Sequence, residues 1–396
     1  MIVINPNVFG ASNLDGRVRE YVSRVLSERQ LFRHRSDGVP SWNSKFERLL
    51  ADWTGCGAVA LSSGTAALRV ALRVAGVSAG DRVLVSAYTF VASAMAVTSL
   101  GAIPEPVDVT TALGIDVTDL RRRLNSDVRA VIGVHVRGQM ADLSAVAQFL
   151  GARGIPLIED ACQAMGASCD GRPAGSVGDL GVLSFQQNKQ LASGEGGAIV
   201  SRRPELVTAC ARYADLGAIR DDTGLPDWDD ERAMLGENCR MTEVQAAILC
   251  AQMEDLRAVL AQQRDLRDQL RAVITERGVV IATSADPSGD SASHILILAR
   301  DHDHARLMRE SMAADKVVGG IIWDRPYYCF QAFRRAGLAP EQLGVLAAPT
   351  AERLAPRLVA VPISPGLKLT QVEELGTAIT TAYFHPASVA GIGEGR

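Results

Sequence analysis

Short runs of β-branched residues alternate with helix-length segments between residues 58 and about 200. Each run is followed by polar or glycine-bearing loop residues and then by an amphipathic stretch such as Leu143–Leu150. Three of the runs are Val83–Val85, Val131–Val134 and Pro156–Glu159. The pattern predicts an α/β fold with a mostly parallel sheet flanked by helices. Because ligands gather at the carboxyl ends of parallel strands, chemistry is expected in the loops that follow these runs.

The helical pattern changes beyond about Asn238. Residues 1–240 are predicted to form one large domain with an N-terminal segment. The segment 241–276 has helical periodicity and ends before Gly278, so it is predicted to be a helix that bridges two domains. The strand-like His294–Leu298 begins a smaller α/β portion. Residues 277–384 are therefore predicted to form a small C-terminal domain, and residues 385–396 a loose tail.

The composition is that of an ordinary globular protein. Of the 396 residues, 47% are apolar and 22% are charged, which suffices for one large domain and a smaller one. The net charge of −4, without basic runs interleaved with aromatics, argues against a nucleic-acid partner. Arg121–Arg123 is interpreted as an exposed helix face.

Cysteine usage and hydropathy argue against other classes. The seven cysteines are scattered, without a Cys-x-x-Cys pair or a histidine cluster, so neither a disulfide framework nor a metal site is expected. Met1–Pro6 lacks the features of a signal peptide, and no stretch of about 18 uncharged apolar residues predicts a membrane span. We expect a soluble, cytoplasmic protein with reduced thiols.

Lysine is rare in this chain, and one of its four lysines has an unusual setting. Lys189 closely follows a short apolar strand, in Ser184–Lys189, and precedes the glycine-rich Gly194–Gly197. A lysine on such a strand-end loop is placed to form an imine with a carbonyl cofactor. The alternative is a solvated charge, because lysine scarcity beside abundant arginine can reflect coding bias.

Three other regions carry groups that would complement such a lysine. Gly64 and Thr65 begin a helix whose free amides suit a phosphate, although a plain helix cap is the alternative. Ser184, in the lysine loop, could donate its hydroxyl to the same phosphate. Asp160 ends an apolar strand and could pair with a pyridinium nitrogen or cap the next helix. Phe90 follows another strand and could stack on a flat cofactor or pack in the core.

Taken together, these motifs resemble a known family. The run of Glu159–Asp160 with Gln163, then Ser184–Phe185, Lys189 and Gly194–Gly197, is similar to that of the DegT/DnrJ/EryC1/StrS aminotransferases. The resemblance extends from about residue 46 to residue 362. It implies a fold-type I enzyme that depends on pyridoxal 5′-phosphate (PLP), which residues 1–240 would bind.

The resemblance also implies roles for single residues. Lys189 would form the imine with the cofactor and Asp160 would pair with its ring nitrogen, and these two would be the catalytic residues. Gln163 would lie against the ring face opposite Phe90. The phosphate would be bound by Gly64, Thr65 and Ser184. Asn238 falls where the family places an asparagine that reaches the neighbouring subunit's phosphate, so a homodimer with shared sites is expected.

Departures from the family pattern bear on the substrate. Gln186–Asn188 stands where His-Pro-Thr is common, and it resembles the branch that uses glutamine to aminate keto-inositols such as scyllo-inosose. A related branch makes aminohydroxybenzoate. Ser86 and Cys239 replace a usual proline and a usual aromatic, and both are expected near the substrate mouth. The segment Gln30–Arg35 falls where the family places a substrate-facing loop. Candidate contacts to hydroxyls or to the donor carboxylate are therefore Arg33, His34 and Arg35, and the alternative for each is a simple surface residue. The role of Arg240 stays open.

The expected activity is transfer of an amino group from glutamine or glutamate to the ketone of a cyclic polyol. The acceptor would be a keto-cyclitol or a nucleotide keto-sugar in bacterial secondary-metabolite or carbohydrate biosynthesis. One alternative is a PLP-dependent dehydratase or other lyase. In sugar dehydratases similar to this family a histidine replaces the lysine, whereas Lys189 is present here. The other alternative is a non-catalytic, PLP-binding regulatory protein.

Overall fold

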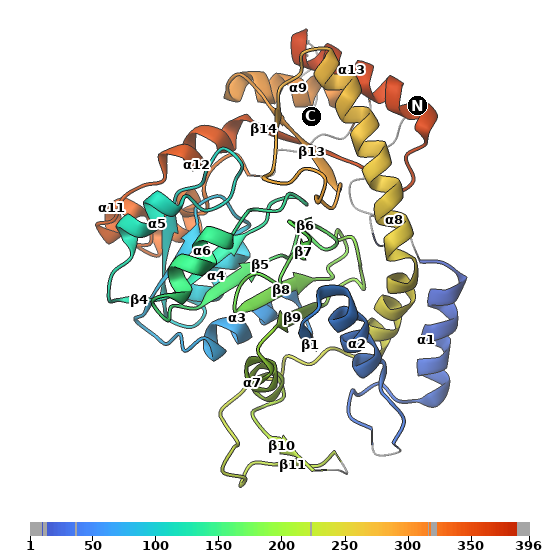
Figure 1. Cartoon of the computed structure of the whole chain (residues 1–396), viewed down its shortest axis with the longest axis vertical. Coiled ribbons are helices and arrows are strands. Elements are labelled where there is room, and N and C mark those ends of the chain that lie inside the picture. The colour runs from blue at the N-terminus through green and yellow to red at the C-terminus, as the bar shows by residue number, and fades with distance from the viewer. Residues whose placement is uncertain are drawn as a thin grey trace, which may run out of the picture.

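A seven-stranded sheet forms the centre of the molecule in the computed structural model (Figure 1). The structure describes residues 10, 14–35, 38–221, 224–315, 317 and 323–385. In spatial order the strands are β1 (Gly57–Leu61), β9 (Gly197–Ser201), β8 (Leu180–Ser184), β5 (Leu157–Asp160), β4 (Val128–Val134), β2 (Arg82–Ser86) and β3 (Ile103–Val107). Only β9 runs antiparallel to its neighbours in this sheet. The predicted mostly parallel sheet flanked by helices is confirmed.

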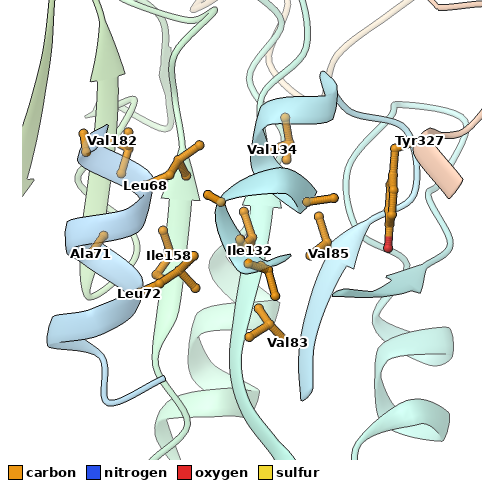
Figure 2. Packing of buried hydrophobic residues seen from close by; sticks show 14 of the residues in the cluster. Leu68, Ala71, Leu72, Val83, Val85, Ile132, Val134, Ile158, Val182 and Tyr327 are labelled. Atoms are coloured by element: carbon orange, nitrogen blue, oxygen red, sulfur yellow. The ribbon is translucent and has the colours of Figure 1, made fainter. Parts of the chain in front are cut away.

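Helices cover the sheet because its strands present apolar side chains on both faces. They are α2 (Trp42–Thr54), α3 (Gly64–Val74), α4 (Val91–Thr98), α5 (Val117–Arg123), α6 (Ser144–Gly151) and α7 (Pro204–Ala214). Figure 2 shows the helix α3 side chains Leu68, Ala71 and Leu72 beside Ile158 and Val182 of the sheet. The three helical positions follow i, i+3, i+4 spacing, which puts them on one stripe. Full burial of a leucine in such a core stabilises the fold by about 1.5–3 kcal/mol.

The long helix α8 (Glu243–Glu276) joins the buried cluster between α2 and the sheet to a second core. Its first turn is fixed by a capping box between Thr242 and Gln245. The first half of α8 packs beside α1 (Gly16–Glu28) and α2, whereas its second half reaches the upper part of the molecule in Figure 1. Leu256 and Leu270 are among the residues it buries in the two cores.

The second core belongs to a three-stranded antiparallel sheet and two helices. The strands, in spatial order, are β12 (Ile281–Ala282), β13 (His294–Leu298) and β14 (Leu358–Pro362), and the helices are α9 (His302–Ala314) and α13 (Val372–Phe384). Short helices lie between α9 and β14, namely α10 (Gln331–Arg335), α11 (Pro340–Leu343) and α12 (Pro349–Leu354). Two-residue strands form two further pairs, β6 (Ser168–Cys169) with β7 (Arg172–Pro173) and β10 (Ile219–Arg220) with β11 (Pro226–Asp227).

The segment with the short helices packs on the large core although it follows α9 in the chain. Tyr327, Phe333 and Ala351 belong to the same buried cluster as the residues under α3. Asp108, just after β3, accepts hydrogen bonds from the amides of Thr350 and Ala351 at the beginning of α12. Part of the chain after residue 277 therefore packs on the large core and not on the second core.

Arg123 corrects the interpretation of Arg121–Arg123 as an exposed helix face. Arg121 and Arg122 are exposed, but Arg123 is buried and pairs through Nε with Asp119 at 2.6 Å. Its two terminal nitrogens donate to the carbonyls of Leu346 and Ala347. The charge pattern alone could not reveal this, because the carbonyl partners lie more than 220 residues away in the sequence.

Two further findings concern the predictions about membranes and the tail. No helix within the described ranges is long and apolar enough to cross a membrane. The predicted loose tail falls outside the described residues beyond residue 385.

Candidate active site

The loops after five strands meet at one edge of the central sheet. The strands β1, β2, β4, β5 and β8 share one direction, so their carboxyl ends lie together. These loops and one residue of the later segment, Trp323, enclose a cavity of about 570 Å³. It is lined by Ser63, Gly64, Thr65, Leu68, Phe90, Ala92, Arg137, Asp160, Cys162, Gln163, Ser184, Gln186, Asn188, Lys189, Glu195 and Trp323. The structure thus brings together Gly64, Thr65, Phe90, Asp160, Gln163, Ser184 and Lys189, but neither Asn238 nor the candidates Arg33, His34 and Arg35.

Asp160 is the last residue of β5 and is only 5% exposed. Its Oδ2 accepts a hydrogen bond from the Ser93 hydroxyl at 2.6 Å, and its Oδ1 accepts one from the Cys162 amide at 3.1 Å. Ser93 is held in turn by Thr89, whose Oγ1 lies 2.7 Å from the Ser93 Oγ. Among the described residues no cationic side chain forms an ion pair with Asp160. A buried carboxylate without a cation is costly, so the cavity is suited to a ligand with positive charge at this point.

The neighbouring Glu159 faces a closed environment instead. Its Oε1 accepts from His135 Nε2 at 2.7 Å, and both side chains are fully buried. Three backbone amides also donate to it, those of Gly175, Val177 and Gly178. Burial raises the pKa of Glu159, but the hydrogen bonds from His135 and the amides outweigh burial and lower the pKa overall.

Helix α3 presents its N-terminus to the cavity at Gly64 and Thr65. The Ser63 hydroxyl caps the helix by accepting from the Ala66 amide. A Cβ on Gly64 would lie 2.8 Å from Ser184 Cβ and 3.0 Å from Cys162 Sγ, so a larger residue would not fit. The close approach puts the Ser184 hydroxyl beside the first amides of α3, an arrangement that suits an anion.

Lys189 projects from the loop after β8 into the same cavity. Burial lowers the pKa of its amine, and the nearby Arg137 charge lowers it further, against the opposite effect of Asp160. A lowered pKa increases the fraction of neutral amine, the form that attacks a carbonyl and accepts a proton.

Glutamines of helix α8 hold the lysine loop in place. Gln252 both accepts from the amide and donates to the carbonyl of Ala192. Gln263 accepts from Gln190 at 3.0 Å and donates to a backbone carbonyl that follows β14. These buried bonds tie the residues that follow Lys189 to the long helix, and a loop fixed in this way positions its side chains precisely enough for chemistry.

Phe90 and Gln163 lie where the sequence predicted groups for a flat ligand. Phe90 is 51% exposed within this chain and lies on the cavity wall, with its ring centroid 6.1 Å from that of Trp323. Gln163 also lines the cavity, and its Oε1 accepts from the Arg137 amide at 3.2 Å. Tyr88, the other ring in the Phe90 loop, packs in the core.

Asn238 and the N-terminal candidates lie away from the cavity within one chain. Asn238 is exposed and lines neither wall of the cavity. Arg33 pairs with Glu47 at 2.8 Å and His34 with Asp215 at 3.0 Å. Arg240 also pairs with Asp215, and Arg35 with Glu28. Arg33, His34 and Arg240 line a separate cavity of about 240 Å³.

Ser86 and Cys239, which were expected near the substrate mouth, are core positions within this chain. Both side chains are buried, at 0% and 4% exposure, and neither lines the 570 Å³ cavity. Ser86 ends strand β2, where its hydroxyl is 3.5 Å from the carbonyl of Ile132. Both are core positions because the strand and the loop that carry them are covered by other elements.

Four residues of the site were missed from the sequence. Arg137 lies in the turn after β4 and would have been found by treating that strand end like the others. Ser93 supports Asp160 from inside a helix, and its small polar side chain gives no signal. Trp323 and His294 come from the later part of the chain, and no local pattern relates them to this cavity.

The residues at the cavity fit the groups of PLP. A buried carboxylate without a cationic partner suits a protonated ring nitrogen, and the first amides of α3 with Ser184 suit a phosphate. An amine with a lowered pKa suits an imine. Among the described residues, no group of three or more metal-ligating side chains could hold a metal ion.

Comparisons with known proteins agree with this geometry. The model of the DegT/DnrJ/EryC1/StrS aminotransferase family matches residues 26–380. A 3-amino-5-hydroxybenzoate synthase from Amycolatopsis mediterranei is 31% identical over 341 residues, covering 84% of this chain and 85% of that protein. An L-glutamine:scyllo-inosose aminotransferase from Streptomyces griseus is 35% identical over 254 residues, covering 63% and 60%.

A solved structure extends the likeness to the fold. The crystal structure of a 3-amino-5-hydroxybenzoic acid synthase matches with a TM-score of 0.82 at 25% identity, over 93% of this chain and 96% of that one. The family match spans far more than half of the chain, and the matched residues include every loop of the cavity. This chain belongs to the DegT/DnrJ/EryC1/StrS family of PLP-dependent aminotransferases.

Proposed function

We propose that this enzyme transfers an amino group from glutamine or glutamate to the ketone of a cyclic polyol, a keto-cyclitol or a nucleotide keto-sugar. The observation that carries the proposal is the set of three side-chain amides around Lys189. Gln163, Gln186 and Asn188 line the same cavity as the lysine. Each amide both donates and accepts hydrogen bonds, which suits a substrate with several hydroxyl groups. Relatives named for a scyllo-inosose and for a hydroxybenzoate support a cyclic acceptor.

In this proposal Asp160 and Lys189 have distinct tasks. Bound PLP supplies an electron sink that stabilises negative charge on the substrate carbon beside the transferred nitrogen. Asp160, kept in place by Ser93, would hold the ring nitrogen in its protonated form, which makes this sink effective. The neutral Lys189 amine would accept the proton from the α-carbon of the donor, and in the second half-reaction the protonated amine would deliver a proton to the acceptor carbon. Phe90 and Gln163 would confine the ring between them.

The test is a half-reaction screen on the PLP-loaded enzyme. Loss of the cofactor's visible absorbance with each amino acid identifies the donor, and its return with candidate ketones identifies the acceptor. The proposal expects glutamine or glutamate in the first step, and a hydroxylated cyclic ketone in the second. Return of the absorbance only with open-chain ketones would contradict it. Release of water and ammonia without an aminated product would indicate the dehydratase or lyase alternative, and no reaction with any amino acid would indicate the regulatory one.

We also propose that the enzyme is a homodimer in which Asn238 completes the partner's phosphate site. Asn238 is exposed and lies outside its own chain's cavity. Residues close to it in sequence expose large apolar side chains, with Leu235 92% and Trp228 56% exposed. Large apolar side chains exposed to solvent are a feature of interfaces, and the hairpin β10–β11 lies in this segment at the lower end of the molecule (Figure 1). Sedimentation should show a dimer, and Asn238→Ala should weaken PLP retention without changing the oligomeric state.

A further inference from the structure

Arg137 occupies a constrained position at the carboxyl end of β4. It lies in a tight turn in which the Gln139 amide donates to the Val136 carbonyl. Its φ is 50°, a left-handed conformation that is uncommon for a residue other than glycine. The next residue, Gly138, has a φ of 83° and lies against the side chains of Ser291 and Ser293, which leave no space for a Cβ. The loop before β13 therefore packs against the turn and restricts its conformation, which fixes the direction of the Arg137 side chain.

The guanidinium of Arg137 lacks the anionic partner that such a group normally has. Its Nε is buried and makes no hydrogen bond, and no carboxylate pairs with it among the described residues. Among the described residues, the one side-chain hydrogen-bond contact of the guanidinium is with His294, where Nη1 lies 3.5 Å from Nε2. Buried arginines are normally paired, as Arg123 is in this chain. The open donors of Arg137 therefore await an anion that the chain itself does not provide.

His294 does not supply negative charge but fixes the guanidinium. The Ser293 hydroxyl donates to the Arg137 carbonyl, which leaves its oxygen free to accept from His294 Nδ1 at 3.0 Å. His294 Nε2 is then the acceptor that faces Arg137, so the ring is neutral. Burial, followed by the charges of Arg137 and Lys189, lowers the pKa of His294 well below its ordinary value, in agreement with this state. The pair is a cation held by a neutral acceptor.

Arg137 lines both the main cavity and a small recess beside it. This recess, of about 30 Å³, is lined by Arg137, Lys189, Ser293 and His294 but by no residue of α3. Gly64 and Thr65, which are predicted to bind the phosphate, line only the main cavity. An anion held by Arg137 in the recess would therefore lie beside Lys189 and would contact no residue of α3.

We infer that Arg137, held by His294, binds a carboxylate of the substrate beside Lys189. The inference rests on the proposed aminotransferase function. The carboxylate has two possible sources, the α-carboxylate of the amino donor and a carboxylate on the cyclic acceptor. Arginine suits either source, since its planar donors match the two oxygens of a carboxylate.

The first experiment compares matched donors on PLP-loaded wild type, Arg137→Gln and the exposed-site control Arg335→Gln. Glutamine is paired with 4-aminobutanamide, which is glutamine without its α-carboxylate. If Arg137 binds the donor, the half-reaction with glutamine should slow by about 10- to 100-fold in Arg137→Gln, as expected for loss of a charge-assisted bond. The half-reaction with 4-aminobutanamide should not change, and Arg335→Gln should behave as wild type.

The second arm compares matched acceptors on the pyridoxamine-phosphate form. These are 3-oxocyclohexane-1-carboxylate and cyclohexanone. A loss confined to the ketone with the carboxylate assigns Arg137 to the acceptor, and a loss with glutamine alone assigns it to the donor. If Arg137→Gln changes both members of each pair equally, the inference is wrong.

A binding measurement separates this inference from the proposed function. Glutarate carries two carboxylates and no amino group, so its affinity for the PLP-loaded enzyme can be measured by calorimetry without turnover. Arg137→Gln should bind it at least about 10-fold more weakly, and Arg137→Lys should recover part of the affinity. Equal glutarate binding with loss of PLP would place Arg137 on the cofactor and overturn the inference. Weakened glutarate binding in an enzyme that aminates no tested ketone would refute only the proposed acceptor.

Discussion

The buried charges of this molecule fall into two regions that differ in how they are satisfied. In the scaffold, Glu159 accepts from His135 and three amides, and Arg123 pairs with Asp119 and donates to two carbonyls. At the cavity, Asp160 has no cation and Arg137 has no anion among the described residues. Glu159 and Asp160 are adjacent carboxylates in one strand. They differ in their hydrogen-bond partners, because successive side chains of a strand point to opposite faces of the sheet. Buried charges that stabilise the fold have all their hydrogen-bond partners within the protein. Charges that bind a ligand lack a partner of opposite charge within the protein.

The contrast between the scaffold and the cavity predicts the largest effect for Lys189, on the rate of transamination. Lys189→Ala should reduce transamination by at least about 10³-fold, because both the imine and the proton transfer need its amine. The free energy of unfolding of the apoenzyme should not fall, since the lysine makes no scaffold bond through its side chain. Steady-state rates and the visible absorbance of added PLP are the measurements. Lys368→Ala, at an exposed position, is the matched control and should keep both. Turnover by Lys189→Ala would show that the cavity lined by Lys189 is not the active site.

The adjacent carboxylates should separate stability from activity. Glu159→Gln should lower the free energy of unfolding by about 3 kcal/mol or more, since its amide nitrogen would face donors in a buried pair. Asp160→Asn should change it by less than about 1 kcal/mol in the apoenzyme while reducing turnover. Urea unfolding of both variants, with rates measured in parallel, tests the contrast. Equal destabilisation by the two variants would show that Asp160 is also a scaffold residue.

The same pair predicts an acid dependence. The folded-state pKa of Glu159 is lowered, so the stability it contributes is present above the ordinary carboxyl pKa. It is lost as the pH falls through the lowered pKa, because the folded protein must then take up a proton. The difference in unfolding free energy between wild type and Glu159→Gln should therefore narrow in acid. A difference that stays constant between neutral pH and strong acid would contradict an ionised Glu159.

The two arginines give a smaller contrast of the same kind. Arg123→Met should cost about 2–3 kcal/mol in unfolding free energy, because Asp119 and two carbonyls lose a buried partner. Arg137→Met should cost little or should stabilise the apoenzyme, since its Nε is unsatisfied. Thermal unfolding of the two variants side by side provides the measurement. A loss at Arg137 as large as that at Arg123 would mean that Arg137 belongs to the scaffold.

The residues of the cavity were predicted from the sequence better than the buried charges of the scaffold. Lys189 and Gly64 each follow a strand and Asp160 ends one, and a parallel sheet brings such strand ends together, so these positions could be predicted without the tertiary structure. Arg123 was misread because its partners are carbonyls from a distant segment, which no local pattern encodes. His294 and Trp323 were missed for the same reason. Local periodicity predicts which edge binds a ligand, whereas the contributions of distant segments depend on packing.

The smallest predicted effect concerns the pH dependence of the open region. The pKa of Lys189 is lowered in the fold by burial, so the folded protein binds fewer protons there than the unfolded chain does. Stability due to this residue is therefore lowest below the folded pKa, and it rises with pH toward the ordinary lysine value. Lys189→Met should thus be more stable than the wild-type apoenzyme at neutral pH, by a margin that disappears in alkali. Chemical unfolding at a series of pH values tests this, with Lys368→Met as the control, for which no such trend is expected. If the difference in unfolding free energy stays the same at high pH, the variant gains its stability from packing. Burial of the charged Lys189 ammonium would then not destabilise the wild-type protein.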